Sequence, residues 1–532
     1  MKIVISDSLP SSAAELLRSE GWNVDAQPSR SATELDTALR DADGLIVRSA
    51  TQVTAELIAS APQLKIIARA GTGVDNVDLE AASQKGVLVV NAPGANSISV
   101  AEHTCALMLG LARSVSRADT LMKGGTWDKK SLQGAELRGK TLGICGLGRI
   151  GREVARRARA FEMKIVAHDP YISSQMADDL AIELVSLDLL CERADFISLH
   201  VPSTADTRGV LNRERLALCK QGVRIINTAR GDLIDESALK DAILSGQVAG
   251  AGLDVFETEP PLDVTLTGLP QVIATPHIAA STKEAQELVG LETAACVRDF
   301  LRSGVVRNAV NFPSVTPEDF NRLQPYLTLA ERLGGFLGQL TEERVEGVGI
   351  RYYGELAGHS HDMVVGAVLV GLFRTILSSS VTLVNARSLA QQRGLEITES
   401  HSSRPRNFTS LISIKLHTSR GETWAEGAVF EPGEPRLVLL DGVEVEAPLA
   451  GTIVVIRNSD QPGVIGEVGT IFGKHRLNIT AFALGRGTDG AVGVVSVEEK
   501  ATVTASITDA TISLVNEIRN VPTVRQVGLV RL

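Results

Sequence analysis

The stretch GLGRIG, residues 146–151, constrains the fold of this chain more than any other feature. It follows the apolar run KTLGICG and precedes a segment with the spacing of an amphipathic helix, after which KIVAHD again has the character of a strand. Gly146 permits a tight strand-to-helix turn, Gly148 lets a pyrophosphate approach the backbone, and Gly151 lets the helix pack closely on the strand. The free N–H groups at the helix start would then face the phosphates. The stretch therefore predicts a dinucleotide-binding turn.

An acidic residue at the end of the following strand indicates which dinucleotide binds. Asp169 lies 23 residues after Gly146. A carboxylate at this place binds the hydroxyls of the adenosine ribose and repels a 2′-phosphate, and no arginine follows it in HDPYISS. The sequence thus predicts NAD rather than NADP. The alternative is a packing turn without a ligand, which the matching order of strand, helix and acid disfavours.

The chain has 532 residues, too many for one hydrophobic core, and its patterns predict several units. Apolar strands alternate with helical segments before residue 96, which predicts a parallel sheet covered on both faces. A long helical stretch, 97–125, leads to a second, complete doubly wound series that ends near VIATPH. A helix from about Ser281 to Arg302 follows. If it returns to the first sheet, residues 97–280 form a nucleotide-binding domain inserted in a substrate domain of residues 1–96 and 281–306.

The C-terminal half has a different character. After the proline-containing linker RNAVNFPSVTPED, residues 317–448 predict an intervening α+β domain in which we find no chemical motif. Residues 452–532 follow the order β-α-β-β-α-β, which is ferredoxin-like. The fold class is therefore α/β, with a Rossmann-like domain inserted in a second doubly wound domain, followed by an α+β domain and a ferredoxin-like domain.

Composition excludes several classes of function. A formal net charge of −10 argues against a nucleic-acid partner. The five cysteines are scattered without ligand spacing, so we expect reduced thiols and no metal site. The most apolar run, MVVGAVLVGLF, is too short to span a bilayer, and the N-terminus resembles a strand rather than a leader. A cytoplasmic protein without a membrane partner is expected.

Three polar side chains follow strands of the nucleotide-binding series, where the carboxyl ends of parallel strands form the ligand crevice. Arg230 lies in INTARGDLID, Glu259 in GLDVFETEPP and His277 in TPHIAAST. His277 is suited to accept a hydroxyl proton, an ionised Glu259 would orient its ring, and Arg230 can bind a carboxylate. Each residue alone has a structural explanation, so the interpretation depends on their coincidence at one edge of the sheet.

The motifs GLGRIG, NTARG, DVFETEP and TPHIAAST resemble those of the D-isomer-specific 2-hydroxyacid dehydrogenases. The resemblance covers essentially the whole chain. The resemblance implies that Arg230, Glu259 and His277 are the catalytic residues. It also implies the following contacts with NAD: Thr72, Gly146, Gly148, Arg149, Ile150, Gly151, Asp169, Val201, Thr228, Asp254, Ala279 and Ala280.

Within this family the chain is similar to members that oxidise 3-phospho-D-glycerate to 3-phosphohydroxypyruvate, the first step of the phosphorylated route to L-serine. The stretch ARAGTGVDNVD, 68–78, is similar to their substrate loop. Such a substrate needs cations for its phosphate, and Arg48 and Arg69 end adjacent apolar strands. We expect Gly73 and Asn76 to hold the carboxylate region. The alternative for Arg48 is a surface ion pair.

The last segment, VVIRNSDQPGVIGEVGTIFGKHRLNITAFALGR, resembles an ACT domain, a module that binds amino acids. The resemblance implies an effector site at Asp460, Gly463, Asn478 and Ile479, completed by a neighbouring subunit, with L-serine as the inhibitor. It also implies a homo-oligomer, a dimer or tetramer, with the helix from Ser97 in its interface. The alternative is a dimerisation module without an effector.

Two rival functions remain open at this point. A glyoxylate or hydroxypyruvate reductase would use the same three catalytic residues, but the long C-terminal half and the two arginines of the first domain argue against it. Some family members are instead NAD-sensing corepressors that bind partner proteins. The ACT-like segment and the absence of an obvious peptide groove in the sequence argue against that function.

Overall fold

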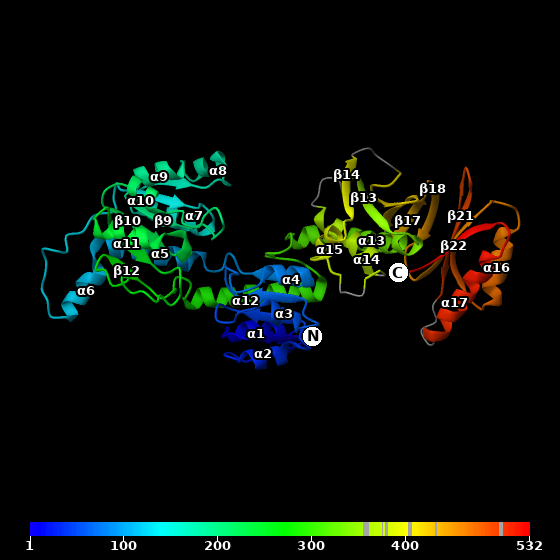
Figure 1. The fold of residues 1–532 in the computed structure, drawn as a ribbon, viewed down its shortest axis with the longest axis horizontal. Coiled ribbons are helices and arrows are strands. Elements are labelled where there is room, and N and C mark those ends of the chain that lie inside the picture. Colours follow the sequence, from blue (N-terminus) through cyan, green and yellow to red (C-terminus); the bar gives the residue numbers. More distant parts are fainter. Residues whose placement is uncertain (355–360, 375, 378–380, 403–406, 431–432, 499–503) are drawn as a thin grey trace.

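The computed structural model describes residues 1–354, 361–374, 376–377, 381–402, 407–430, 433–498 and 504–532. They build four β-sheets with their helices, and Figure 1 shows these units following one another along the long axis of the molecule. The α/β architecture with an added α+β part and a ferredoxin-like end confirms the predicted fold class. None of the described helices combines the length and the apolar character that crossing a membrane requires.

The first sheet has the strand order β2-β1-β3-β4-β5, and all its pairs are parallel. Helix α12, which follows the second sheet in sequence, packs on one face beside α1 through Ala294 and Val297. The opposite face is covered by α2, α3 and α4. The strands are β1 (Lys2–Ile5), β2 (Asn23–Ala26), β3 (Gly44–Val47), β4 (Ile66–Arg69) and β5 (Leu88–Asn91). The helices are α1 (Ser11–Arg18), α2 (Ala32–Leu39), α3 (Ala55–Ala59), α4 (Leu79–Lys85) and α12 (Lys283–Ser303).

The second sheet has the order β12-β11-β10-β9-β6-β7-β8 and is also parallel. The chain order reverses between β6 and β9, and in such sheets the ligand crevice lies at this point. The strands are β6 (Thr141–Cys145), β7 (Lys164–His168), β8 (Glu183–Leu184), β9 (Phe196–Leu199), β10 (Val223–Asn227), β11 (Val248–Leu253) and β12 (Val272–Ala274). Its helices are α7 (Arg149–Ala160), α8 (Ser174–Asp179), α9 (Leu187–Arg193), α10 (Arg213–Leu218) and α11 (Glu236–Leu244).

The connection to this sheet is helical, as the sequence predicts, but it is interrupted. The stretch 97–125 is not one helix but two, α5 (Ser97–Arg113) and α6 (Val115–Lys123). Ser114 separates them with a φ of 50°, in the left-handed region, which ends the helical hydrogen-bond ladder. Helix α5 packs on α7 and the second sheet, whereas α6 buries none of its residues and projects from the body in Figure 1.

The C-terminal half contains the other two sheets. The third has the order β14-β13-β15-β16-β17-β18 and packs against α13 (Pro317–Leu340), α14 (Asp362–Arg374) and α15 (Ala386–Gln392). The fourth, β20-β21-β19-β22, packs against α16 (Val464–Lys474) and α17 (Thr504–Arg519), the ferredoxin-like arrangement. The strands are β13 (Val345–Gly354), β14 (Glu396–Ser402), β15 (Ser410–Thr418), β16 (Gly421–Phe430), β17 (Glu434–Leu440), β18 (Val443–Pro448), β19 (Thr452–Asn458), β20 (Ile479–Gly487), β21 (Gly490–Val497) and β22 (Val524–Arg531).

Candidate active site

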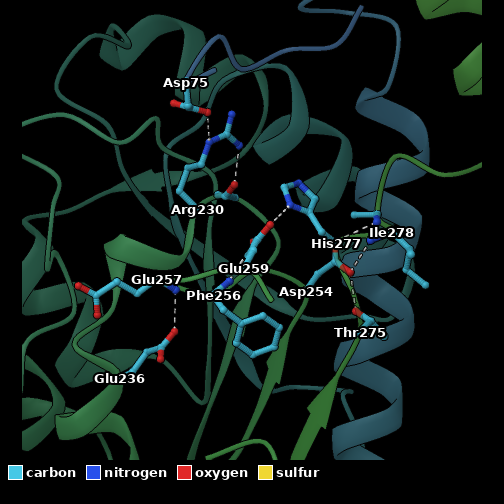
Figure 2. Close-up of polar contacts among 12 residues, drawn as sticks. Asp75, Arg230, Glu236, Asp254, Phe256, Glu257, Glu259, Thr275, His277 and Ile278 are labelled. Carbon is cyan, nitrogen blue, oxygen red and sulfur yellow. Dashed lines mark hydrogen bonds and ion pairs between the residues drawn. The ribbon is translucent and has the colours of Figure 1, made fainter. Parts of the chain in front are cut away.

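A polar cleft of about 490 Å³ lies between the first two sheets, lined by residues of both. The loop after β4, residues 70–76, forms one wall, and Arg48 and Arg69 add their side chains to it. The other wall comes from loops that follow β10, β11 and β12. Arg230, Glu259 and His277 all line this cleft, and Figure 2 shows the three side chains close together.

His277 and Glu259 form a hydrogen-bonded pair at the centre of the site. Nδ1 of His277 lies 2.7 Å from Oε2 of Glu259, whose Oε1 accepts the backbone N–H of Phe256 at 3.1 Å. Partial burial opposes ionisation of Glu259, but the hydrogen bonds from His277 and Phe256 outweigh it, and the pKa of this carboxyl is below its usual value. An ionised Glu259 fixes the ring so that Nε2 of His277 remains available for a substrate.

The turn that carries His277 is organised by a buried carboxylate. His277 has a φ of 52°, and its N–H donates to the backbone oxygen of Asp254 at 2.9 Å. The Asp254 carboxylate is fully buried and accepts the N–H groups of Ile278 and Ala279, both at 2.9 Å. Burial would raise its pKa, but these donors, together with His103 and Thr275, lower it below the usual value. The Asp254 carboxylate therefore holds the turn that carries His277.

Arg230 follows β10 and reaches across the cleft. Its Nε lies 3.0 Å from Oδ2 of Asp75, and its Nη1 donates to the carbonyl oxygen of Ala229 at 2.6 Å. Its Nη2 lies against Gly73, where a Cβ atom would be only 1.7 Å from it. Gly73 therefore leaves room for the guanidinium, and its contact with a substrate stays a prediction.

The next residue, Gly231, is a feature that the sequence analysis missed. A Cβ on Gly231 would lie 1.9 Å from the carbonyl carbon of Phe256 and 2.3 Å from the nitrogen of Glu257. The loop after β10 and the loop after β11 therefore touch through their backbones at this point. This contact fixes Arg230 relative to Glu259. The motif NTARG contains the glycine, but only the packing reveals what it contacts.

The wall opposite His277 is cationic. Arg48 and Arg69 both line the cleft. Burial, and then the neighbouring charge of Arg230, lowers the pKa of Arg69 to about 10, so it is still a cation at neutral pH. Asn76 also lines the cleft, but its side-chain amide donates to the carbonyl oxygens of Arg48 and Thr51, both at 2.6 Å. Its N–H groups support the loop of Arg48, and its contact with a substrate carboxylate stays a prediction.

The glycine turn after β6 has the geometry that a pyrophosphate needs. Gly146 has a φ of 93°, and a Cβ there would lie 2.6 Å from the backbone oxygen of His200. A Cβ on Gly151 would lie 2.1 Å from the oxygen of Gly146, whereas Gly148 faces open space. Gly148 is the N-cap of α7 and leaves the first N–H groups without a side-chain acceptor. The Asp169 carboxylate accepts the N–H of Leu147 at 2.8 Å, which places it beside this turn. These residues fit NAD.

The other residues expected to contact NAD lie around the same crevice. Arg149 and Ile150 form the first turn of α7, and Val201 lies against Gly146 after β9. Thr228 follows β10 and shares a hydrogen bond with Thr104 of α5. Ala280 lines the polar cleft, and so does Thr72, whose hydroxyl donates to Asn96 at 3.0 Å. Ala279 is held by Asp254.

The expected effector residues lie in the fourth sheet unit. Asp460 follows β19 with a φ of 50° and lies 3.3 Å from Nε of Arg486. Gly463, with a φ of 99°, begins α16, and a Cβ there would meet nothing within 4 Å. Asn478 precedes β20 and donates to Glu498 at 2.8 Å, and Ile479 is the first residue of that strand.

Comparison with family models identifies three segments of the chain. Residues 105–279 match the NAD-binding domain of D-isomer-specific 2-hydroxyacid dehydrogenases. Residues 322–441 match the intervening domain of D-3-phosphoglycerate dehydrogenase, and residues 452–510 match the ACT domain.

Two curated relatives are similar in sequence over the full length of this chain. D-3-phosphoglycerate dehydrogenase of Methanocaldococcus jannaschii is 41% identical, with 100% of both chains covered. That of Bacillus subtilis is 38% identical, over 100% of this chain and 99% of its own. The crystal structure of D-lactate dehydrogenase from Aquifex aeolicus, complexed with NAD and lactic acid, is 32% identical with a TM-score of 0.53. It covers 59% of this chain and 100% of its own.

Proposed function

Because this chain belongs to the D-3-phosphoglycerate dehydrogenases, NAD-dependent members of the D-isomer-specific 2-hydroxyacid dehydrogenase family, we propose that it oxidises 3-phospho-D-glycerate to 3-phosphohydroxypyruvate. The observation that carries this proposal is the cleft itself. The His277–Glu259 pair and Arg230 face two further arginines across it, beside a nucleotide turn. One wall suits acid–base chemistry on a hydroxy acid, and the other suits a second anionic group.

The chemistry follows from the positions of these side chains. Glu259 accepts the Nδ1–H of His277, so Nε2 is the atom that takes the proton from the substrate hydroxyl. Glu259 then stabilises the imidazolium that forms. Arg230 binds the substrate carboxylate and polarises the oxygen on the reacting carbon. When bound at the glycine turn, NAD supplies the hydride acceptor.

An assay with alternative substrates tests the proposal. NADH oxidation with 3-phosphohydroxypyruvate should greatly exceed that with glyoxylate, because only the phosphorylated substrate engages the cationic wall. Preference for glyoxylate would support the reductase alternative. An absence of turnover with any 2-oxo acid would support an NAD-sensing binding protein.

Arg48 is the residue that we assign to the substrate phosphate. Its side chain lines the cleft, and among the described residues its Nη1 donates only to the backbone oxygen of Ser8, at 3.2 Å. Arg48→Ala should raise KM for 3-phosphohydroxypyruvate about ten- to hundredfold, the usual loss for a charge-assisted hydrogen bond. KM for an unphosphorylated 2-oxo acid should hardly change. The matched control is Arg40→Ala, since Arg40 is exposed and pairs with Asp36 on α2. Equal effects on both substrates would remove Arg48 from the phosphate site.

We further propose L-serine as an inhibitor that binds at Asp460, Gly463, Asn478 and Ile479. Asp460 is a carboxylate in a left-handed turn, and its present partner, Arg486, is exposed and easily displaced by an ammonium group. Asp460→Ala should raise the serine concentration for half inhibition about tenfold or more, without changing uninhibited turnover. Steady-state inhibition curves measure this. Asp489→Ala, in the turn between β20 and β21, is the control. Unchanged inhibition of the Asp460 variant would place the effector elsewhere.

We propose the roles of the domains and the assembly of the subunits on the same basis. Residues 1–96 and 281–306 would bind substrate, 97–280 NAD, and 452–532 the effector, with 317–448 intervening. A homo-oligomer is supported by exposed apolar side chains on and beside α5 and α6, where a second subunit would cover them. These are Ile98, Leu109, Val115, Met122 and Trp127.

A further inference from the structure

The guanidinium that the proposed mechanism reserves for a substrate carboxylate already contacts a carboxylate of the protein. Asp75, in the loop after β4, accepts from Nε of Arg230 at 3.0 Å, although the two residues lie 155 positions apart and on opposite walls of the cleft. Figure 2 shows the Asp75 carboxylate facing the outer edge of the guanidinium. Nη1 of Arg230 is held by Ala229 and Nη2 lies against Gly73. Asp75 thus takes a donor of Arg230 that a carboxylate ligand would need.

The charges of the cleft explain why a carboxylate lies there. Arg48, Arg69 and Arg230 line the same small space. Burial and the charge of Arg230 lower the pKa of Arg69 to about 10, and the charge of Asp75 acts in the opposite direction, favouring the cation. Glu259, the other acid on the cleft wall, is engaged with His277. Among the acids that line the cleft, Asp75 is therefore the one that compensates the guanidinium groups, and Asp7 behind the wall adds a smaller contribution at Arg69.

This contact is suited to being broken. The Asp75 side chain is 70% exposed and that of Arg230 is 30% exposed. Exposed ion pairs of this kind contribute little to stability, because water solvates the separated charges well. A substrate carboxylate that brings a phosphate to the cationic wall at the same time would displace it readily.

We propose that Asp75 is an internal substitute for the substrate carboxylate. It holds Arg230 and bridges the two walls when no substrate is bound, and it leaves Arg230 when a carboxylate ligand enters. This inference rests on the proposed function, which assigns Arg230 to the substrate carboxylate. It makes Asp75 an internal competitor of carboxylate ligands only, because a ligand without a carboxylate leaves the pair intact. The substrate carboxylate must displace the Asp75 carboxylate from Arg230 in order to bind. Removal of Asp75 would eliminate this competition.

The test compares two phosphorylated ligands that differ in their carboxylate. In Asp75→Asn the dissociation constant of 3-phospho-D-glycerate should fall about two- to fivefold, the range of an exposed ion pair. It is measured by titrating 3-phospho-D-glycerate into the full chain in the presence of NADH. The dissociation constant of sn-glycerol 3-phosphate, which lacks the carboxylate, should stay unchanged. Glu257→Gln is the matched control, because Glu257 is exposed and Figure 2 shows its side chain directed away from Arg230. It removes the same charge without touching the pair. A thermal melt confirms that each variant is folded.

The outcomes separate this inference from the proposed function. Unchanged or weaker binding of 3-phospho-D-glycerate to Asp75→Asn would overturn the inference and indicate that Asp75 positions Arg230 for the substrate. Equal tightening of both ligands, or the same change in Glu257→Gln, would also overturn it, because general electrostatic attraction would then be the cause. Turnover of 3-phosphohydroxypyruvate by the unaltered enzyme tests the function independently. Failure of that turnover with selective tightening still present would refute the function and support the role of Asp75.

Discussion

Replacing His277 by asparagine should lower kcat for reduction of 3-phosphohydroxypyruvate by about 10²–10⁴-fold, the usual contribution of a general acid–base. Asparagine is the appropriate replacement because His277 has a φ of 52°, and asparagine adopts the left-handed region more readily than most residues. Its amide can still donate to Glu259, which now accepts from Nδ1 at 2.7 Å. It cannot transfer a proton near neutral pH. The variant therefore removes the chemistry of the side chain while keeping the turn.

The controls for His277→Asn separate chemistry from binding. NADH affinity, measured by fluorescence titration, should stay within a factor of about two, because the glycine turn that would hold the pyrophosphate precedes α7 and lies on a different loop from residue 277. His417→Asn alters a half-exposed histidine of the third sheet unit and should leave kcat unchanged. Near-full turnover in His277→Asn would refute its assignment as the proton acceptor.

The features that the sequence predicted well are those that a short segment determines by itself. The turn at 146–151 needs glycine at three places for local steric reasons, and these can be recognised without knowledge of the rest of the fold. The alternation of buried strands and helices likewise fixed the parallel sheets, because a strand buried on both faces must be apolar throughout. GLIV of β3, one of the apolar segments before residue 96, is fully buried.

Local patterns failed where a strand is short or polar. Strands β2 (NVDA) and β8 (EL) lie at sheet edges with exposed or half-buried residues, so they have no apolar signal. Strand β14, EITESHS, is also at an edge and largely polar. The break at Ser114 was missed for a related reason. Its neighbours are ordinary helix formers, and only the backbone geometry of the folded chain identifies the boundary.

The candidate site was predictable as a set of chemical groups but not as a network. Arg230, Glu259 and His277 each follow a strand of one sheet, and that was enough to expect them near each other. The contacts of Asp75 with Arg230 and of Asn76 with Arg48 depend on how the two walls of the cleft face each other. Such contacts join loops of different length and irregular backbone, for which neither periodicity nor spacing gives a prediction.

Gly231 is the clearest example of such a contact, and we expect Gly231→Ala to lower kcat/KM by about 10²-fold or more. Its new Cβ would lie 1.9 Å from the carbonyl carbon of Phe256, so the loops after β10 and β11 must separate. Phe256 donates its N–H to Glu259, and Arg230 directly precedes the altered residue. Both loops that carry the proposed catalytic residues would shift, and misplacement by about 1 Å can reduce a rate by 10²-fold.

Loss of stability must be separated from this catalytic effect. Overpacking of this kind destabilises a domain by about 1–3 kcal/mol, so Gly231→Ala should still be folded at assay temperature, as a thermal melt can establish. Gly469→Ala is the control, since a Cβ on this helical glycine meets nothing within 4 Å and the residue lies far from the cleft in sequence and fold. It should keep full turnover. If Gly231→Ala were folded and equally active, the backbone contact with Phe256 would not determine the geometry of the site, and Arg230 and Glu259 would be positioned independently of each other.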